Sequence, residues 1–444
     1  MKDVFGGLFG VIAIPLGFFV VGFVWWFILR DANFNFATVF SAALLLLPLV
    51  LPFVLFYVTY ERWFEFVHTM FKYNNKRSTL RIKLPQEVLK SPEAMESVFA
   101  HIHNPNNADN HRQGFLDGKH PLPTSFELVS IGGEVRFYVN IHEKVKNLLE
   151  AQLYSQYPGV EIVEEPIDYT AELKWDPEQL FVMSFHVTKK NDSIYPIKTY
   201  IEFGHDKNPK EEEKFEPMAA MIEFLSQAKP HERIFIQILC TPHAKRNYMT
   251  GHLKPVTTWE ADGIAKINEM MGRDDKRQGA EEETESRPML TMGERDTITA
   301  IERNCSKAAY DVGIRTMYIS TDPTKIDGKK IAPTFGSFRQ FNVIGRNELS
   351  PRWKTDFDHS WYEDYSGARV MERKRHELEE YKKRSYYAGE GRINDIHQPK
   401  TMSVEELATI FHLPGTSVLT PGLSRITSNR REAPSNLPIG NLPS

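Results

Sequence analysis

The first 60 positions contain two long runs of hydrophobic residues. No charged residue occurs from Val4 to Leu29 or from Ala37 to Tyr60. As helices rising 1.5 Å per residue, the runs would be roughly 39 and 36 Å long, more than the ~30 Å hydrocarbon layer of a bilayer. The pattern predicts a transmembrane two-helix hairpin within residues 1–70, with the lipid bilayer as a partner.

The charges around these runs predict an orientation. The turn at 30–36 carries one charge of each sign, whereas five basic residues follow the second run within positions 62–81. By the positive-inside rule, both termini face the cytoplasm and the protein lies in the inner membrane. Because neither run holds an ionisable group, an anchor is favoured over an ion path. The aromatic residues expected at the two membrane interfaces are Trp25, Trp26, Tyr57, Tyr60 and Trp63.

Residues 71–168 alternate between strand and helix patterns. A short strand at 79–84 precedes a helix that begins near Pro92, and alternation around Gly132-Gly133 predicts a β-hairpin over 125–139. A helix striped by Val145 to Leu153 and a strand at 160–163 complete the segment. The order β-α-β-β-α-β is that of a ferredoxin-like domain.

Residues 169–345 repeat this order more loosely. Strands are expected at 180–187, 233–240 and 314–320, and helices at 218–228 and from Ile298 onward. Residues 272–288 are charged and almost free of large apolar side chains, so we expect a mobile insertion there. The predicted fold class is α+β, with tandem ferredoxin-like cytoplasmic domains after the hairpin.

The last hundred residues change in character. Residues 346–400 form a polar helical segment, with a long helix expected over 363–387. Residues 401–444 form a C-terminal arm: a short helix opened by the capping box Ser403 to Glu406, then a proline-rich tail. Such an arm can lie over a neighbouring protein. Its expected partner-binding residues are Val404, Leu407, Phe411, Pro434, Asn436, Leu437 and Pro438.

The composition and the motif search mainly exclude classes of function. With 444 residues, 41% hydrophobic and 25% charged, the chain can build at least two cores. It contains no GxxxxGK[ST] phosphate loop, and its two cysteines have no metal-ligand spacing. His101, His103, His111 and His120 could converge on a metal from a loop, but exposed histidines are favoured. We therefore expect no cofactor, no metal and no enzymatic activity.

Basic clusters at 373–375 and 382–384 raise the question of nucleic acid. Glutamates interleave with both clusters, and the net charge is −4. A solvated helix face with internal ion pairs is favoured over a DNA-binding surface, and contact with nucleic acid stays open.

Several segments resemble a known family. The runs Ser125–Val139 (SFELVSIGGEVRFYV) and Glu150–Pro158 (EAQLYSQYP) are similar to the N-terminal region of bacterial HerA/TraG-like conjugation and type IV secretion ATPases. Pro196–Tyr200, Gln340–Asn342, Glu406–Pro414 and Ala433–Pro438 occur there in the same order. The resemblance spans residues 79–438 and includes no catalytic motif.

The resemblance implies a subunit of a translocation machine. The expected function is a membrane-anchored assembly or regulatory subunit that holds a separately encoded HerA/TraG-like P-loop ATPase at the inner membrane face. The alternative is a self-assembling structural scaffold, a ring or cage without a motor. A homo-oligomer is expected in either case, and an enzyme acting on a membrane substrate is a third, weaker reading.

Overall fold

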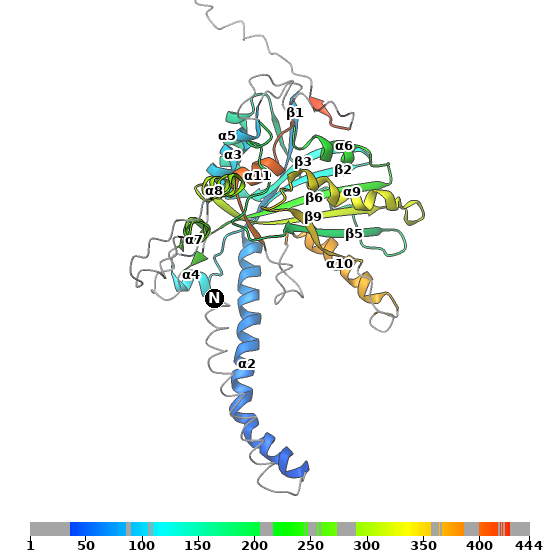
Figure 1. Ribbon diagram of the computed structural model, residues 1–444. Helices are drawn as coiled ribbons and strands as arrows, with labels where there is room; N and C mark the ends of the chain where they lie inside the picture. Colours follow the sequence, from blue (N-terminus) through cyan, green and yellow to red (C-terminus); the bar gives the residue numbers. More distant parts are fainter. Residues whose placement is uncertain are drawn as a thin grey trace, which may run out of the picture. The chain divides into compact units, whose positions relative to one another are not determined.

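The computed structural model gives an α+β protein, which confirms the predicted class (Figure 1). It describes residues 36–85, 90–104, 108, 110–204, 216–243, 245–246, 255–256, 259–272, 290–356, 364, 366–385, 399–415, 418, 420 and 422–426. Two compact units are formed. The smaller comprises residues 1–75, 106–121 and 244–256, and the larger comprises the rest.

The smaller unit contains one long helix. Helix α2 (Phe36–Asn74) is accompanied by the short helix α4 (His111–Phe115) and the small strands β7 (Lys245–Arg246) and β8 (Pro255–Val256). The second half of α2 packs on the segment around α4. Val67 is buried there, and the rings of His68 and His120 stack with centroids 4.4 Å apart.

The transmembrane hairpin is the main correction to the sequence-based expectations. Within the described residues, no helix combines the length and apolar character needed to cross a membrane. The first apolar run, 4–29, lies outside those residues, and α2 does not end near Tyr60 but continues through Arg62 and Lys72. The prediction of an inner-membrane protein with two spans and both termini in the cytoplasm is therefore wrong.

The larger unit begins with a βαββαβ half. Its elements are β1 (Arg77–Pro85), α3 (Pro92–Ile102), β2 (Thr124–Ile131), β3 (Glu134–His142), α5 (Glu143–Gln156) and β4 (Glu161–Glu164). The strands lie in the order β4-β1-β3-β2, and every neighbouring pair is antiparallel. Gly132 and Gly133 form the β2–β3 turn with positive φ angles of 59° and 92°.

A second half repeats this order with a helical insertion. Its elements are β5 (Phe181–Lys189), α6 (Ala219–Ser226), β6 (Glu232–Pro242), β9 (Ala309–Ser320), α9 (Ile331–Gly336) and β10 (Leu349–Lys354). The strand order is β10-β5-β9-β6, again antiparallel throughout. Helices α7 (Trp259–Met270) and α8 (Met292–Cys305) are inserted between β6 and β9.

The two halves form one continuous sheet rather than two separate domains. Strand β2 pairs with β6 over eight residues, so the halves share a ten-stranded, mainly antiparallel sheet. Helices α3, α5, α6 and α9 pack on one face, over a single core that draws on both halves. Helix α10 (Ala368–Lys382) covers a second, smaller core on the opposite face (Figure 1).

The C-terminal residues tie these layers together. Strand β11 (Lys400–Ser403) pairs with the start of β9, helix α11 (Val404–Ile410) joins the helical layer against α3, and β12 (Arg425–Ile426) pairs with β1. Residues 399–426, which we call the strap, thus run from the second half to the first. All seven residues of α11 are buried.

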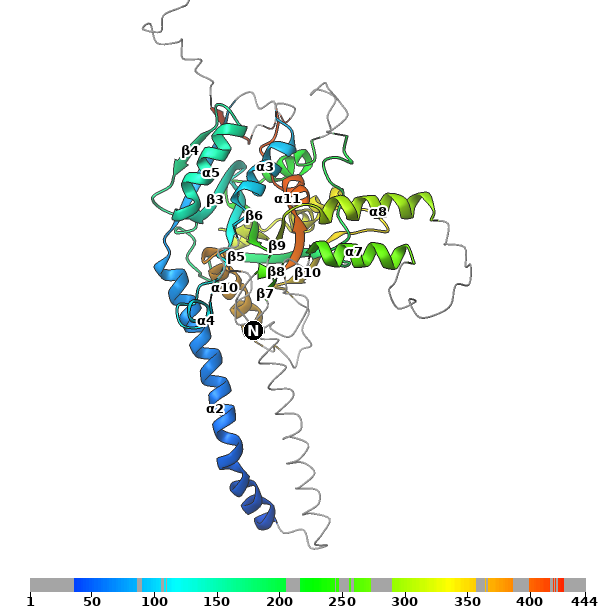
Figure 2. The same cartoon turned by 90° about the vertical axis from the view of Figure 1, so that its left-hand side faces the viewer.

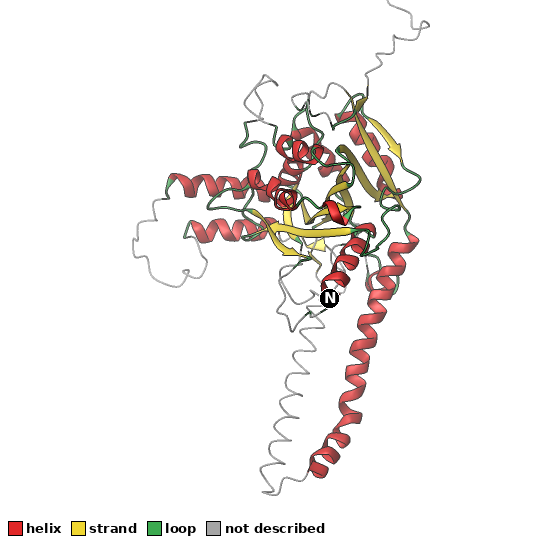
Figure 3. Cartoon of the chain, turned by 90° about the vertical axis from the view of Figure 1, so that its right-hand side faces the viewer, coloured by secondary structure: helices red, strands yellow, loops and turns green. Residues whose placement is uncertain are grey.

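Other differences concern helix bounds and the insertion. The long helix expected over 363–387 is the shorter α10, and most of the charged insertion 272–288 falls outside the described residues. Figure 2 shows α7 and α8 side by side and extending away from the strands, and Figure 3 shows the same pair from the other side.

Candidate functional site

Polar and aromatic side chains form a row across six strands, on the sheet face that α10 covers. Each member lies directly opposite the next in the strand register, so their side chains point to the same face. We call this row the ladder. Its members, in order from β3 to β10, are Tyr138, Glu127, Gln237, Arg315, His186 and Trp353.

One half of the ladder centres on Glu127, which has no exposed surface. Arg384, just after α10, approaches it with Nε 3.0 Å from Oε1 and Nη2 3.2 Å from Oε2. Tyr169 donates a hydrogen bond to Oε2 (2.7 Å), and Gln237 donates to Oε1 (3.1 Å). The hydroxyl of Tyr381 lies 2.6 Å from that of Tyr169, so α10 joins the same network.

The other half centres on Arg315, which is also fully buried. Its Nη1 donates to Gln237 Oε1 (3.0 Å), and its Nε lies 3.0 Å from Glu377 Oε2 on α10. The same carboxylate oxygen is 2.9 Å from Nε2 of His186. Arg315 Nη2 donates to the carbonyl of Ser385 (2.8 Å), so both ends of the network contact the α10 segment.

Burial and ion pairing set the charge states in this network. Burial opposes ionisation of Glu377, but the Arg315 and His186 side chains beside it lower the pKa of its carboxyl to about 2. Burial lowers the pKa of His186 from its ordinary value, so its neutral form is favoured near pH 7. Burial also acts to lower the pKa of Arg384, but Glu127, Tyr169 and Asp168 together outweigh it and raise that pKa. Glu377 and Arg384 therefore stay charged at neutral pH.

Arg384 also has an unusual backbone. Its φ angle of 50° is the one positive value for a non-glycine residue in the described chain. Left-handed backbone costs a non-glycine residue of order 1–3 kcal/mol and persists where surrounding contacts compensate. Here the contacts are those with Glu127 and with Asp168, whose Oδ2 lies 2.6 Å from Arg384 Nη1. The strained residue is thus the one that fixes the end of α10 on the sheet.

The ladder holds helix α10 against the sheet through paired charges. The Glu127 and Arg315 side chains are fully covered. Glu127 is paired with Arg384 just after α10, and Arg315 is paired with Glu377 on α10. Buried charges cost free energy unless they are paired and hydrogen-bonded, and pairing requires defined positions of the groups. The arrangement therefore fixes where α10 lies on the sheet.

The strap is fixed by a second set of buried charges. Lys189 at the end of β5 lies 2.7 Å from Glu406 in α11, and both side chains have no exposed surface. The Lys189 ammonium also donates to the carbonyls of Ser193 and Thr401 (2.8 and 3.1 Å). Glu406 completes the predicted capping box with Ser403. The box therefore positions a carboxylate for an internal ion pair as well as capping the helix.

The expected partner-binding residues fall in two groups. Val404, Leu407 and Phe411 are buried in the core of their own chain, at 2, 0 and 0% exposure. They could reach a separate protein only if the strap left its position. Pro434, Asn436, Leu437 and Pro438 lie outside the described residues.

The expected membrane-interface residues also divide. Trp25 and Trp26 lie outside the described residues. Tyr57 and Tyr60 are half-buried and Trp63 is 48% exposed, all on α2. The Tyr60 ring stacks on Phe64 with centroids 6.1 Å apart.

The histidines weighed as metal ligands belong to no metal-binding group among the described residues. His101 bonds to the carbonyl of Ser97 on its own helix, and His103 to that of Ala309 on β9. His111 and His120 belong to the other compact unit. No group of three or more potential ligands that could hold a metal ion occurs in the part of the chain that the structure describes.

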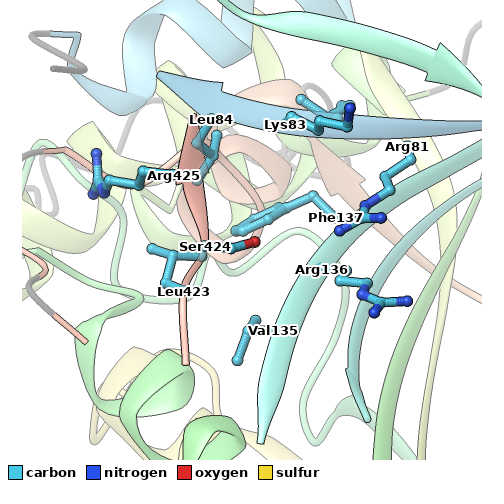
Figure 4. A pocket seen from close by; sticks show the side chains of 10 residues that line it. Arg81, Lys83, Leu84, Val135, Arg136, Phe137, Leu423, Ser424 and Arg425 are labelled. Atoms are coloured by element: carbon cyan, nitrogen blue, oxygen red, sulfur yellow. The ribbon is translucent and has the colours of Figure 1, made fainter. Parts of the chain in front are cut away.

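A small pocket lies where β1 and β3 separate. The two strands pair up to Ile82 and Phe137, and the end of the strap then enters between them. Leu423 bridges to Val135, and Arg425 pairs with Leu84 (Figure 4). The pocket has a volume of about 70 Å³, with apolar walls that include Leu84, Val135, Phe137 and Leu423 and a basic rim of Arg81, Lys83, Arg136 and Arg425 (Figure 4).

Sequence reasoning missed both the ladder and the pocket. Glu127, Gln237 and Arg315 interrupt otherwise apolar strands, and no role was predicted for any of them. The available signal was that β2, β6 and β9 are apolar on both sides of these residues, as in strands covered on two faces. The pocket gave no such signal, because it depends on the pairing of Leu84 with Arg425, 341 positions away.

These features define an α+β protein in which paired charges fix a helix and a strap on one ten-stranded sheet. The chain belongs to the DUF8128 family, described as a domain of unknown function, which it matches over residues 67–425. The match ends at Arg425, where the strap pairs with β1. No curated protein matches the chain. The family description names no activity, so the expected link to conjugation and type IV secretion finds no support in it.

Proposed function

We propose that this chain is a non-catalytic assembly or regulatory subunit that holds a separately encoded P-loop ATPase related to the HerA/TraG-like proteins. The resemblance across residues 79–438 supports this proposal, and the chain has no phosphate loop of its own. The ladder and the strap support a rigid platform, because their buried charges require defined positions.

The observation that carries the proposal is the arm formed by α7 and α8. The helices are antiparallel, since Trp259 at the start of α7 donates to the carbonyl of Asn304 at the end of α8 (3.4 Å). The flanking strands β6 and β9 pair along eleven residues without help from the arm. An element that the sheet does not need, and that extends away from it (Figure 2), is suited to contact another protein.

The arm also presents apolar side chains to solvent. Ile264 on α7 is 52% exposed and Met292 at the start of α8 is 76% exposed. The arm's helices are well anchored at the base, where Trp259 and Ile301 are buried. We therefore expect these outer residues to contribute to the ATPase contact.

The test is co-purification of the tagged full-length chain with a purified P-loop ATPase encoded beside it. The double variant Ile264→Asp, Met292→Asp should bind that ATPase at least tenfold more weakly. The matched control is Leu148→Asp, which changes a 41% exposed residue on α5 and should bind normally. Equal binding by both variants would exclude the arm, and failure of the unaltered chain to bind would refute the proposed function.

A further inference from the structure

The base of the α7–α8 arm has an apolar cluster of its own. Trp259 and Ile301 pack there with Ile194, Cys305 and Ala309. This cluster is distinct from the core beneath α3, α5, α6 and α9. Charged side chains at the end of α8 connect the arm to the helices that cover that core.

Glu405 of the strap helix α11 makes one of these connections. Its side chain is buried, and it meets two cations at the end of α8. Its Oε1 lies 3.2 Å from Nε of Arg303, and its Oε2 lies 2.9 Å from Nζ of Lys307. Arg303 is in the last turn of α8, and Lys307 follows the helix end at Cys305 by two residues. One carboxylate thus holds both sides of the point where the arm joins the rest of the unit.

The electrostatics of a helix end make this contact depend on both cations. The C-terminus of a helix carries unpaired carbonyls and the negative end of the helix dipole, which disfavour a nearby carboxylate. Arg303 and Lys307 reverse this preference for Glu405. Burial acts to lower the pKa of Lys307, but its bonds to Glu96 and Glu405 outweigh burial and raise that pKa. The ammonium therefore stays charged at neutral pH.

Neighbouring contacts hold the two cations in place. Lys307 Nζ also lies 2.6 Å from Oε1 of Glu96 on α3. Arg303 Nη2 is 3.4 Å from Oγ1 of Thr199 and 3.8 Å from Oε1 of Glu202. The end of α8 is therefore tied to α3 and to the segment after β5 as well as to the strap.

We propose that the strap sets the orientation of the α7–α8 arm through Glu405, which is a positioning residue for the partner contact of the arm. The part that concerns the partner rests on the proposed function, in which the arm binds the ATPase. An arm held in one direction loses less conformational entropy on binding than an arm that pivots about its base. Because coupling between two sites is reciprocal, a partner on the arm also stabilises the docked strap.

Loss of the Glu405 charge should spare the fold. The main core retains α11 through Leu407 and Phe411. Arg303 and Lys307 are 31% and 24% exposed, so neither becomes a buried charge without compensation when Glu405 is neutralised. The effect of Glu405→Gln should therefore fall on the orientation of the arm rather than on global stability.

Pulsed electron paramagnetic resonance on the full-length chain measures this orientation without any partner. Spin labels are attached to Ser155→Cys on α5 and Thr299→Cys on α8, two exposed positions, while both native cysteines are buried. The distance distribution should be narrow, and Glu405→Gln should widen it at least about twofold. The matched control is Glu302→Gln, an exposed residue on α8, which should leave it unchanged. Equal distributions in these two variants would overturn the proposal.

A second variant changes the same contact from the side of the arm. Arg303→Gln should also widen the distribution, and it keeps Glu405 paired with Lys307, so it decides the question if Glu405→Gln does not fold. The double variant should match Glu405→Gln alone, because both changes remove one contact. Further widening in the double variant would show that the two residues act separately, contrary to the proposal.

Binding of the purified P-loop ATPase then tests the coupling to the partner. Glu405→Gln should bind about three- to tenfold more weakly with an unchanged melting temperature, because a pivoting arm must be ordered on binding. Glu302→Gln should bind as the unaltered chain does. Normal binding by a variant with a widened distribution would refute the positioning role. If the unaltered chain does not bind the ATPase, the proposed function fails, whereas the distance measurement still decides whether the strap orients the arm.

Discussion

At the scale of single residues, the larger unit uses its charges in an unusual place. Glu127, Arg315 and Glu406 are side chains of a kind that proteins leave at the surface, and each is fully buried. Each has a charged or amide partner at about 3 Å on a different element. The energetic consequence is asymmetric: the pairs add modestly to stability, but loss of one partner leaves the other charge buried without compensation.

This asymmetry predicts a large effect for Arg384→Met. Glu127 would lose its cationic partner, and the free energy of unfolding should fall by about 3–5 kcal/mol. The matched control is Arg375→Met on the exposed face of α10, with an expected change within about 0.5 kcal/mol. Urea denaturation monitored by circular dichroism measures both. A small loss for Arg384→Met would show that Tyr169 and Gln237 alone compensate Glu127.

The low pKa of Glu377 predicts a pH dependence. Its pKa is about 2 in the folded chain against an ordinary value of 4.5, so its ionisation stabilises the fold above about pH 4.5 and this stabilisation is lost as the pH falls toward 2. Glu377→Gln should be less stable than the unaltered chain at pH 7 but lose less further stability over that acid range. Melting temperatures at a series of pH values measure this. Glu379→Gln, on the same helix and 43% exposed, should keep the original acid dependence.

At the scale of elements, the local sequence pattern was sufficient to predict the position of a helix or strand wherever that element is amphipathic. The hairpin of β2 and β3, helix α5 and the capping box of α11 all lie where alternation, stripe or cap predicted them. Strands β10, β11 and β12 were missed because Pro351 and the short lengths remove the alternation signal. Their positions are set by distant strands, and single-sequence periodicity does not contain that information.

The α7–α8 arm depends on one close approach. A Cβ added at Gly263 would lie 2.4 Å from Cys305 Sγ and 2.7 Å from its Cβ. Gly263→Ala should therefore force the helices apart and destabilise the arm by about 1–3 kcal/mol, although alanine favours helix formation. Amide hydrogen exchange along α7 and α8 measures this. The control is Gly293→Ala, because a Cβ added at Gly293 would have no heavy atom within 4 Å. This substitution should leave amide exchange unchanged or make it slower.

At the scale of the whole larger unit, the sequence predicted that the βαββαβ order repeats, but not that the two halves share one sheet and one core. The two halves were expected as tandem domains, whereas β2 and β6 join them and one core includes Phe126, Ile236 and Leu407 together. The ion pairs of the ladder could not be predicted from the sequence either, because the paired residues lie up to 257 positions apart in the chain. Long-range pairing of this kind makes the halves interdependent and the strap part of the fold.

This interdependence predicts that neither half folds alone. A fragment of residues 76–166 would leave β2 as an unpaired edge, with Phe126 deprived of the strap residue Phe411 that packs on it. It would also lack three partners of the buried Glu127, namely Arg384, Tyr169 and Gln237. Such a fragment should lack a cooperative urea transition, whereas residues 76–426 should unfold in one transition by both circular dichroism and tryptophan fluorescence. Two separate transitions in the longer fragment would show that the shared sheet does not couple the halves, and a cooperative transition in 76–166 would show that the first half is an independent domain.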